Sequence, residues 1–440
     1  MSDSWLEGYA HEYLTQNNPN AIERPRYKEG ALRLVPKKHD FRPLCVPLRY
    51  QRLPKAERLS VEEVRDSYIF EKNVLAPVRD IIRHQQTKRS VYDFEGHAKC
   101  FSVDEVVRSI NRYKENLSSQ LCLSKAKLSV IKFDMKHCYD NLNQAKIIQT
   151  VKELFRGDKH DLIFLRKALK YKSTNLTFPK LSSSITDRNN LERSYQMGLR
   201  GKESVVKGCQ KSITQITHLR VFDVLDVVLD QILNGTIRLQ SSKDVYSRKR
   251  GVFQGTALSA TFCDLLYDQL ISESFKFLNE TKDTILIRLA DDFLVLSLNP
   301  NTCQRVFQVA CSQKFKDFGA YINEEKSQFH TTTERTSIDF VGLEITLPTL
   351  DILRRSSFSL NIPRKVVGSF RTLLDYMVRV FEYRLPKEFF KSAAISGEAV
   401  KINVMHVLNR ILKVVGPIHF ICSGHRPISQ KIDLHNLGKV

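Results

Sequence analysis

Residues 284–297 read T-I-L-I-R-L-A-D-D-F-L-V-L-S. The apolar runs 285–289 and 293–298 have the length and the β-branched and aromatic content of strands, which predicts a hairpin with Asp291 and Asp292 at its tip. Tight hairpins favour Asn-Gly or Asp-Gly, so turn geometry does not explain two adjacent aspartates. Two carboxylates about 4 Å apart repel by roughly 4 kcal/mol at an effective dielectric constant of about 20, and a divalent cation would turn that repulsion into attraction. Taken alone, the stretch fits a metal site and a polar surface turn equally well.

A second aspartate-bearing strand is predicted earlier in the chain. Residues 127–134 read K-L-S-V-I-K-F-D, so Asp134 stands at the carboxyl end of this strand, where open sheets with crossover helices bind their ligands. Asp134 beside the Asp-Asp tip would make a cluster of three carboxylates. Two Mg²⁺ ions held by such a cluster activate an attacking hydroxyl and stabilise a leaving pyrophosphate. The pattern predicts the palm site of a polymerase.

The composition indicates a soluble globular protein with a polyanionic partner. The 440 residues are 27% charged and 42% hydrophobic, enough for two or three subdomains. A net charge of +21 favours nucleic acid, although a generally basic solvated surface would give the same total. Nine cysteines without a C-x-x-C pair favour a reducing compartment over a disulfide framework or a zinc ribbon. With no signal pattern and no long apolar segment, we expect an intracellular protein without a membrane partner.

A basic ribbon is predicted near the N-terminus. Residues 31–46 have the pattern of two short strands joined by a polar turn at 37–40. Lys37, Lys38 and Arg42 project from this ribbon and are suited to the phosphates of a nucleotide or a template.

A glycine-containing loop is predicted between a strand at 245–253 and a helix at 257–278. Gly255 in this loop allows the backbone to come close to a ligand at the start of the helix. The basic run 248–250 suits either a phosphate contact or a nuclear-import patch, and its place beside the loop favours the phosphate contact.

The remaining elements are expected from hydrophobic periodicity. Residues 1–30 are expected to be a short lead-in, and 141–247 a long interval with no catalytic constellation, in which 181–193 is loop-like. Further helices are expected at 60–86, 102–118, 144–155, 215–233, 301–318, 366–383 and 400–415, and a further strand at 338–345.

Six stretches resemble, in this order, the motifs of reverse transcriptases and, among these, of the telomerase reverse transcriptases. Together they are far more specific than any one motif alone. They are R-L-V-P-K-K-H-D-F-R-P-L (33–44), similar to the fused first and second finger motifs; F-D-M-K-H-C-Y-D (133–140), similar to the palm motif with the first aspartate; G-V-F-Q-G-T-A-L-S-A (251–260), before the primer-supporting helix; R-L-A-D-D-F-L-V-L-S (288–297), the double-aspartate motif; G-A-Y-I-N-E-E-K (319–326), the lysine motif; and D-F-V-G-L-E-I (339–345), the primer grip.

Several details favour the telomerase form over retroelement enzymes. Leu289 stands where retroviral and many retrotransposon enzymes carry an aromatic residue, Phe293 follows the aspartate pair, and Cys138-Tyr139-Asp140 is typical of the telomerase motif. The interval 141–247 is long, like the insertion in telomerase fingers. The resemblance begins at about residue 31, where telomerases usually carry RNA-binding and N-terminal domains before the fingers, so a short form lacking these domains is expected.

The resemblance implies an α+β right-hand polymerase fold. Its palm would contain an antiparallel sheet with the Asp-Asp hairpin, flanked by fingers and a helical thumb. The expected domains are fingers at 31–125, palm at 126–345 with a fingers-type insertion at about 142–247, and a thumb or C-terminal extension at 346–440.

The resemblance also implies roles for single residues. Asp134 and Asp291 would hold two Mg²⁺ ions and Asp292 would assist them. Met135 would be a further metal ligand. Tyr139 would lie under the incoming sugar and exclude a 2′-hydroxyl. The other implied roles are Lys37 and Arg42 on the triphosphate, Gln254 and Gly255 on the nucleotide and template, and Lys326 as the proton donor to pyrophosphate. The plainer alternatives are a core position for Tyr139, a helix cap for Gln254 and a solvated side chain for Lys326.

The implied function is RNA-templated DNA synthesis that adds telomeric repeats to chromosome 3′ ends in the nucleus. The implied partners are a telomerase RNA template, a single-stranded telomeric DNA primer, deoxynucleoside triphosphates and accessory telomere proteins. A retroelement-type reverse transcriptase is one alternative, but it would usually bring an endonuclease, protease or ribonuclease H region, for which 440 residues leave little space. The other alternative is a catalytically inactive RNA-binding scaffold. The three retained aspartates argue against it.

Overall fold

The structure is a computed structural model, and the chain in it forms two compact units. The first unit comprises Met1–Asp93, Lys136–Lys276 and Cys311–Tyr321, and the second Phe94–Met135, Phe277–Ala310 and Ile322–Val440. The residues that the structure describes are 2–17, 25–37, 40–50, 58–89, 96–119, 126–157, 162–173, 176–186, 209–239, 244–331, 336–354, 370–385, 387–390 and 395–423. No helix within these ranges combines the length and the apolar content needed to span a bilayer.

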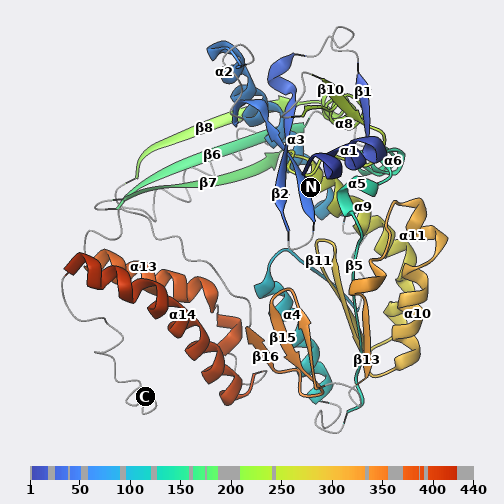
Figure 1. The fold of residues 1–440 in the computed structure, drawn as a ribbon, viewed down its shortest axis with the longest axis vertical. Helices are drawn as coiled ribbons and strands as arrows, with labels where there is room; N and C mark the ends of the chain where they lie inside the picture. Colours follow the sequence, from blue (N-terminus) through green and yellow to red (C-terminus); the bar gives the residue numbers. More distant parts are fainter. Residues whose placement is uncertain are drawn as a thin grey trace. The chain divides into compact units, whose positions relative to one another are not determined.

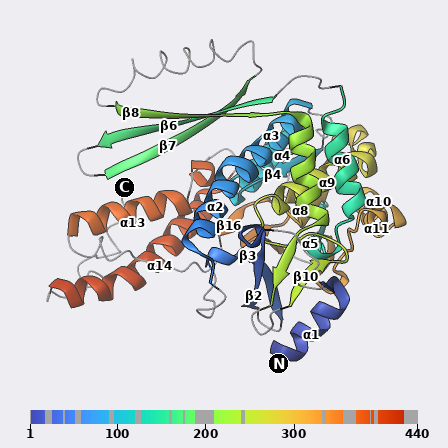
Figure 2. The ribbon, with the colours of Figure 1, turned by 90° about the horizontal axis from the view of Figure 1, so that it is seen from above.

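The first unit contains a five-stranded sheet with the strand order β1-β10-β9-β2-β3. Strands β2 and β3 form an antiparallel ribbon, and β9 joins the free edge of β2 in parallel. A separate antiparallel sheet, β7-β6-β8, forms the long ribbons seen in Figure 2. The bounds are β1 (Leu14–Asn17), β2 (Gly30–Pro36), β3 (Phe41–Pro47), β6 (Leu162–Ser173), β7 (Leu176–Thr186), β8 (Cys209–Leu219), β9 (Thr236–Arg238) and β10 (Val245–Arg248).

Several helices of the first unit pack around one buried helix, α9. Leu266, Tyr267 and Leu270 of α9 are fully buried, and α3, α5 and α6 pack against it. A helix that is covered on several sides needs apolar residues around most of its circumference, which the α9 sequence supplies. The bounds are α1 (Ser2–Tyr13), α2 (Val61–Phe70), the π-helical turn η5 (Glu71–Leu75), α3 (Ala76–Arg89), α5 (Cys138–Asn141), α6 (Gln144–Leu154), α8 (Val221–Leu233), α9 (Ser259–Ser274) and α11 (Gln313–Asp317).

The second unit is built on a five-stranded sheet with the order β13-β5-β12-β11-β4. Val130, Leu294 and Leu296 of its central strands share a core with helix α4, whereas α10 packs on β5 and β12 from the other side (Figure 1). The sheet is therefore covered on both faces. The bounds are β4 (His97–Cys100), α4 (Val103–Ser118), β5 (Ser129–Asp134), β11 (Thr284–Leu289), β12 (Asp292–Ser297), α10 (Pro300–Ala310), η9 (Glu324–Lys326) and β13 (Gln328–Thr331).

The C-terminal part of the second unit consists of a small sheet and two helices. The sheet β14-β15-β16 is antiparallel, and its apolar residues join the same core as α4 and the helices α13 and α14. Asp351 ties these parts together, because its carboxylate accepts hydrogen bonds from Lys114 Nζ (2.9 Å) and Ser396 N (3.1 Å). The bounds are β14 (Ser337–Phe340), β15 (Leu343–Thr346), β16 (Ile352–Arg354), α13 (Phe370–Arg384) and α14 (Gly397–Ser423).

The expected α+β class is confirmed, and most expected elements are found within a few residues. Three assignments are wrong for physical reasons. Residues 215–219, expected in a helix, end β8, where the β-branched Ile-Thr pairs at 213–214 and 216–217 favour a strand. Residues 338–345, expected as one strand, form the β14–β15 hairpin, because Val341 and Gly342 both take positive φ and make a two-residue turn. The helix expected at 301–318 divides into α10 and α11, with Ser312 as the N-cap of α11.

Other predicted segments differ in extent from the elements of the structure or lie partly outside the described residues. The strand expected at 245–253 ends at Arg248, because the amides of Lys249 and Gly251 bond Tyr13 O and Leu142 O instead of a neighbouring strand. Residues 1–30, expected as a lead-in, contain α1 and β1. Part of the loop-like stretch 181–193 belongs to β7, and its remainder, like Lys38 and residues 366–369, lies outside the described residues.

Candidate active site

The predicted Asp-Asp hairpin is formed by β11 and β12. Leu289 pairs with Asp292, which leaves Ala290 and Asp291 as the turn. The left-handed backbone that the turn needs falls on Ala290 (φ 55°) and not on an aspartate. Arg288, only 1% exposed, donates from Nη1 to Ala290 O at 3.2 Å and so bonds the residue with the unfavourable backbone. The hairpin thus carries both carboxylates without requiring a left-handed aspartate.

Asp134 lies beside this hairpin, as the sequence predicts. β5 is the antiparallel neighbour of β12, and Asp134 is the register partner of Asp292. Residues directly opposite each other on neighbouring strands project from the same face of a sheet, with Cβ atoms about 4.5–5.5 Å apart. The Phe133 and Phe293 rings, one position behind, stack with centroids 4.8 Å apart. Asp291 is tied to the end of β5 by its carbonyl, which accepts from Met135 N at 3.2 Å.

The electrostatics of this cluster favour a cation. Burial, and then the neighbouring Asp291 and Asp134 carboxylates, raise the pKa of Asp292 to about 6. Asp134 Oδ2 accepts a hydrogen bond from Lys326 Nζ at 3.1 Å, whereas Asp134 Oδ1 is buried without a hydrogen-bond partner. A buried carboxylate oxygen with no partner is costly unless a ligand satisfies it. We call Asp134, Asp291, Asp292 and Lys326 the carboxylate site.

The donor set of the carboxylate site fits a hard divalent cation, although its side chains are not converged on one point. Within the described ranges, no group of three or more His, Cys, Asp or Glu side chains already forms a metal cage. The Lys326 ammonium stands against Asp134 in place of such a cation. Met135 is 4% exposed and its thioether is a soft donor, so only its main-chain carbonyl suits Mg²⁺.

The basic ribbon of the first unit is the β2–β3 pair. Lys37 and Arg42 are exposed, and the turn between them is closed by Lys37 N donating to Asp40 O at 2.7 Å. Arg33 is also exposed, and the register places it on the same face as Arg42, two register positions further from the turn. Sequence reasoning missed Arg33, which the alternation of positions 33, 35 and 37 along one strand face could have identified.

Tyr139 and the Gln254 loop contact each other through the backbone. Tyr139 is half-buried in the short helix α5, and its carbonyl accepts from Val252 N at 2.8 Å. Two residues further on, Gln254 O accepts from Cys45 N at 2.7 Å, which binds the loop to β3. The structure therefore brings Tyr139, the Gln254 loop and the ribbon strand β3 into one bonded set. Lys37, Arg42, Tyr139, Gln254 and Gly255 are together called the ribbon site.

Gly255 is required by its surroundings. Its φ is 101°, and a Cβ added there would lie 2.7 Å from Cys45 O. A side chain would meet both backbone strain and a steric clash with β3, so only glycine lets the loop pass this close.

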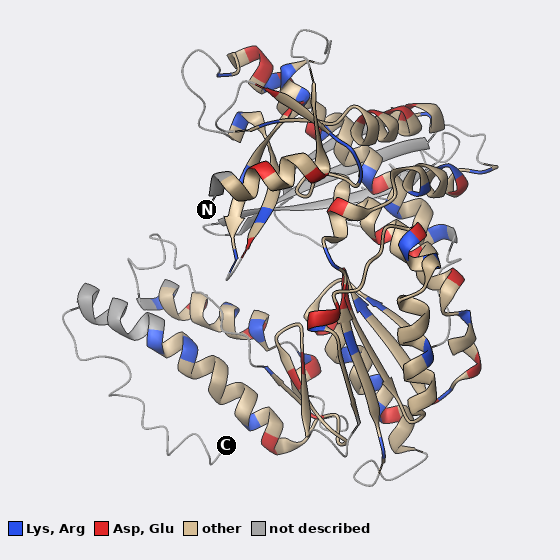
Figure 3. Cartoon of the chain, turned by 45° about the vertical axis from the view of Figure 1, so that its right-hand side comes forward, with Lys and Arg blue, Asp and Glu red and all other residues tan. Residues whose placement is uncertain are grey.

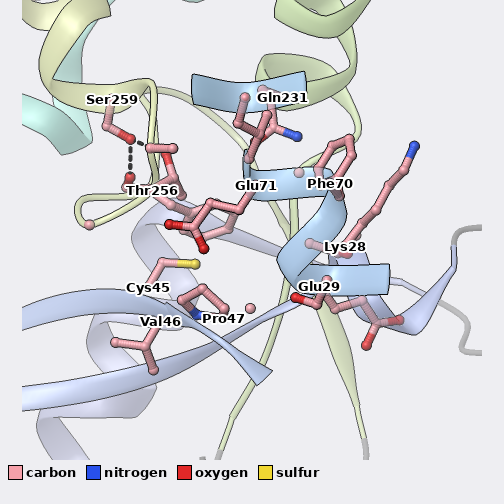
Figure 4. Close-up of a pocket in the computed structure, with 18 of the residues that line it drawn as sticks. Lys28, Glu29, Cys45, Val46, Pro47, Phe70, Glu71, Gln231, Thr256 and Ser259 are labelled. Carbon is pink, nitrogen blue, oxygen red and sulfur yellow. Dashed lines mark hydrogen bonds between the residues drawn. The ribbon is translucent and has the colours of Figure 1, made fainter. Parts of the chain in front are cut away.

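A pocket of about 420 Å³ opens beside the ribbon site (Figure 4). The 45–47 segment of β3 and the loop at Gly255–Thr256 line it on one side, and Phe70 and Glu71 line it on another. Figure 4 shows Cys45 and Glu71 directed toward the same space, with the Thr256–Ser259 hydroxyl pair at its border. The pocket mixes aromatic and polar groups, as small-molecule and nucleotide sites do.

The candidate residues thus form two sets, one in each unit. In the part of the chain that Figure 3 colours, blue segments occur on many helices and strands of both units, so the basic residues are not gathered on one element.

Comparison with known proteins gives concordant results. The family described as reverse transcriptase (RNA-dependent DNA polymerase) matches residues 208–345. The telomerase reverse transcriptase of Saccharomyces cerevisiae is 23% identical over 92% of this chain and 43% of its own length, and that of Tetrahymena thermophila 21% over 62% and 26%. Among solved structures, telomerase from Candida albicans in complex with a TWJ fragment of telomeric RNA is 27% identical, with a TM-score of 0.75 over 96% of this chain and 59% of that one. Apo telomerase from Candida tropicalis is 26% identical, with a TM-score of 0.65 over 97% and 63%. The chain therefore spans less than half the length of the yeast relative.

Proposed function

We propose that the chain, which is similar to telomerase reverse transcriptases over most of its length, catalyses RNA-templated DNA synthesis that adds telomeric repeats to chromosome 3′ ends. The observation that carries the proposal is the register pair Asp134–Asp292 with Asp291 in the adjoining turn. Three carboxylates from two neighbouring strands are the donor set that two-metal nucleotidyl transfer needs.

In this proposal Asp134, Asp291 and Asp292, with the Met135 carbonyl, hold two Mg²⁺ ions. When bound, these ions activate the primer 3′-hydroxyl and stabilise the charge on the leaving pyrophosphate. The orphaned Asp134 Oδ1 and the raised pKa of Asp292 support this, because burial and the neighbouring carboxylates disfavour a charge on Asp292 that a cation would stabilise. Lys326 supplies a proton to the pyrophosphate, and its side chain, 65% exposed, is free to turn from Asp134 toward that leaving group.

The ribbon site receives the nucleotide. Lys37 and Arg42 bind the triphosphate as exposed cations, while Gln254 and Gly255 contact the nucleotide and the template. Tyr139 lies against the sugar and excludes a 2′-hydroxyl, a role that its half-buried position permits and a core position would not. We assign the fingers to 31–125, the palm to 126–345 with an insertion at about 142–247, and the thumb to 346–440.

The partners follow from the same reading. A telomerase RNA provides the template, a single-stranded telomeric DNA the primer, and accessory telomere proteins deliver the enzyme to chromosome ends in the nucleus. The Candida albicans neighbour is described as a complex with a telomeric RNA fragment, which supports an RNA partner here. The net charge of +21 suits a protein that binds the backbone of an RNA–DNA hybrid.

The test is extension of a DNA primer annealed to an RNA template by the purified chain, with deoxynucleoside triphosphates and Mg²⁺. We expect extension on the RNA template, and RNA that co-purifies with the chain should contain a short sequence complementary to telomeric repeats. Absence of extension with hybrid bound would indicate an inactive RNA-binding scaffold. Extension accompanied by RNA with no telomere-complementary sequence would indicate a retroelement-type enzyme.

A further inference from the structure

The basic run 248–250 is bound by helix α1 and does not form a free phosphate-binding patch. The Arg248 side chain is only 2% exposed. Lys249 Nζ donates to His11 O at 2.6 Å, and Arg250 Nη2 donates to a Glu12 carboxylate oxygen at 2.7 Å. The phosphate contact expected of this run is therefore wrong for Arg248, because a buried guanidinium cannot reach a solvated phosphate.

Helix α1 presents three aromatic residues on one face. Trp5, Tyr9 and Tyr13 are spaced by four, the spacing that aligns side chains along a helix. Trp5 and Tyr9 stack with ring centroids 5.2 Å apart, as do Tyr9 and Tyr13 at a greater tilt. Tyr9 and Tyr13 are both buried, so this face packs into the unit.

A buried polar triad joins α1 to the neighbourhood of Tyr139. Tyr9 Oη donates to Asp140 Oδ1 at 2.9 Å, and Arg248 Nη2 donates to the same oxygen at 2.9 Å. Arg248 Nη1 in turn donates to Tyr9 Oη at 2.5 Å. The Arg248 guanidinium also lies 5.5 Å from the Tyr13 ring and 5.3 Å from the Phe253 ring. Burial raises the pKa of Tyr9 well above its ordinary value, in spite of the opposing effect of Arg248, so the hydroxyl remains a hydrogen-bond donor.

Asp140 is the residue after Tyr139 in the short helix α5, and it is itself buried. A four-residue helix has little stability of its own, so its orientation depends on tertiary contacts. Those contacts include the packing of α5 on α9, the triad on the Asp140 side and the bond from Val252 N on the Tyr139 side. Losing one of them leaves Tyr139 attached to the unit but less firmly oriented.

The first turn of α1 makes a parallel contact with the ribbon. Trp5 Nε1 donates to Asp40 Oδ1 at 2.7 Å, and the same oxygen accepts from Phe41 N at 2.7 Å. Asp40 closes the turn between Lys37 and Arg42. One helix face therefore touches the supports of both parts of the ribbon site.

We propose that Tyr9 is a positioning residue which, through Asp140 and Arg248, fixes the orientation of Tyr139 and so sets the discrimination between deoxyribonucleotides and ribonucleotides. The proposal rests on the proposed function, because discrimination has a meaning only for an active polymerase. It assigns a function to helix α1, which makes no contact with substrate in this scheme.

The test is the ratio of kcat/KM for a deoxyribonucleotide to kcat/KM for the matching ribonucleotide. Tyr9→Phe keeps the aromatic stack and removes only the hydroxyl. We expect the ratio to fall by about 3- to 10-fold, because the hydroxyl bonds charged groups but only part of the lost interaction reaches Tyr139. The ratio is measured on a single preparation, so a lower folded fraction cancels. Asp140→Asn, which removes the acceptor charge with little change in shape, should shift the ratio in the same direction.

The control is Tyr13→Phe, which removes a hydroxyl one turn further along the same helix, where the hydrogen-bond partner is Glu12. Its ratio should equal that of the wild type. In a Tyr139→Ala background, Tyr9→Phe should have no further effect on the ratio, since residues that act through one another are not additive. An unchanged ratio in Tyr9→Phe, or an equal additional fall in the Tyr139→Ala background, would overturn the proposal while leaving the polymerase assignment intact. A wild-type chain that incorporates neither nucleotide would overturn both.

Discussion

The carboxylates of the second unit are positioned by main-chain pairing, whereas the ribbon site of the first unit depends on buried side-chain bonds in addition to its main-chain contacts. Asp134 and Asp292 occupy opposite positions on paired strands, and Asp291 is held by its own carbonyl. In the first unit, the turn before Arg42 is held by Trp5 and the helix bearing Tyr139 by Tyr9 and Arg248.

The two sites should therefore differ in how well they tolerate side-chain substitutions. A ladder of main-chain bonds survives most side-chain substitutions, because every residue but proline supplies the same donor and acceptor. A network of buried side chains does not, because removing one member leaves the others without partners. We therefore expect the geometry of the metal ligands to be robust and the selection of the nucleotide to be adjustable by mutation.

The largest effect should come from removing a ligand of the carboxylate site. Asp134→Ala or Asp291→Ala should lower the rate of primer extension by at least about 10³-fold, since metal ions supply several kcal/mol of transition-state stabilisation and each 1.36 kcal/mol is about tenfold. Hybrid affinity, measured by fluorescence anisotropy, should change little, because phosphate contacts remain. Glu280→Ala, an exposed acid of the same unit, is the control. Near wild-type extension by either aspartate variant would contradict the assignment.

The next effect belongs to the ribbon site. Tyr139→Ala should raise ribonucleotide incorporation relative to deoxyribonucleotide incorporation by about 10- to 100-fold, because the space left by the ring admits a 2′-hydroxyl. The measurement is competitive single-nucleotide incorporation followed by gel analysis. If an active variant keeps the wild-type ratio, Tyr139 is a packing residue only.

A smaller, structural effect should follow from Gly255→Ala. The new Cβ would lie 2.7 Å from Cys45 O at a φ of 101°, so the free energy of unfolding should fall by at least about 1 kcal/mol. Urea titration measures this change, and nucleotide KM should rise as β3 shifts. Gly8→Ala is the matched control: this glycine lies within α1 with no atom within 4 Å of the added Cβ, and the substitution should stabilise by about 0.5–1 kcal/mol. Equal stability of wild type and Gly255→Ala would mean that the loop is not constrained by β3.

The smallest catalytic effect is expected beside the metal ligands. Phe293→Leu removes the stack on Phe133 and should reduce the free energy of unfolding by about 1 kcal/mol. The extension rate per folded molecule should stay within about twofold of the wild type, because the Asp134–Asp292 register depends on the main chain. A loss of about tenfold or more at equal folded fraction would show that the carboxylate site also depends on side-chain packing, and the comparison would fail.

The carboxylate site could be predicted from sequence because its determinants are local. The strand ending in Asp134 and the hairpin around Asp291 and Asp292 are visible as apolar runs, and antiparallel pairing brings them together. The Lys326 contact with Asp134 was expected only as part of a motif, since 192 residues separate the two.

The supports of the ribbon site could not be predicted in this way. Tyr9 and Asp140 are 131 residues apart, and neither periodicity nor composition marks their contact. Arg248 looked like part of an exposed basic run, because a single sequence does not show which cations are buried against acids and aromatic rings. The β14–β15 turn was not predicted because Val341 adopts a positive φ that its β-branched side chain disfavours. A valine at this position does not indicate a turn.

The interleaving of the two units has a consequence for synthesis on the ribosome. Strand β2 emerges about 200 residues before its parallel neighbour β9, and β5 emerges about 160 residues before β12 and almost 200 before β13. At about 5–20 residues per second, roughly 10–40 s pass before β2 can be covered. During that time the growing chain exposes an unpaired strand edge, which is a site for aggregation. We therefore expect nascent chains of this protein to depend on chaperones, and splitting the gene at any unit boundary leaves strands in each half whose partners are encoded in the other.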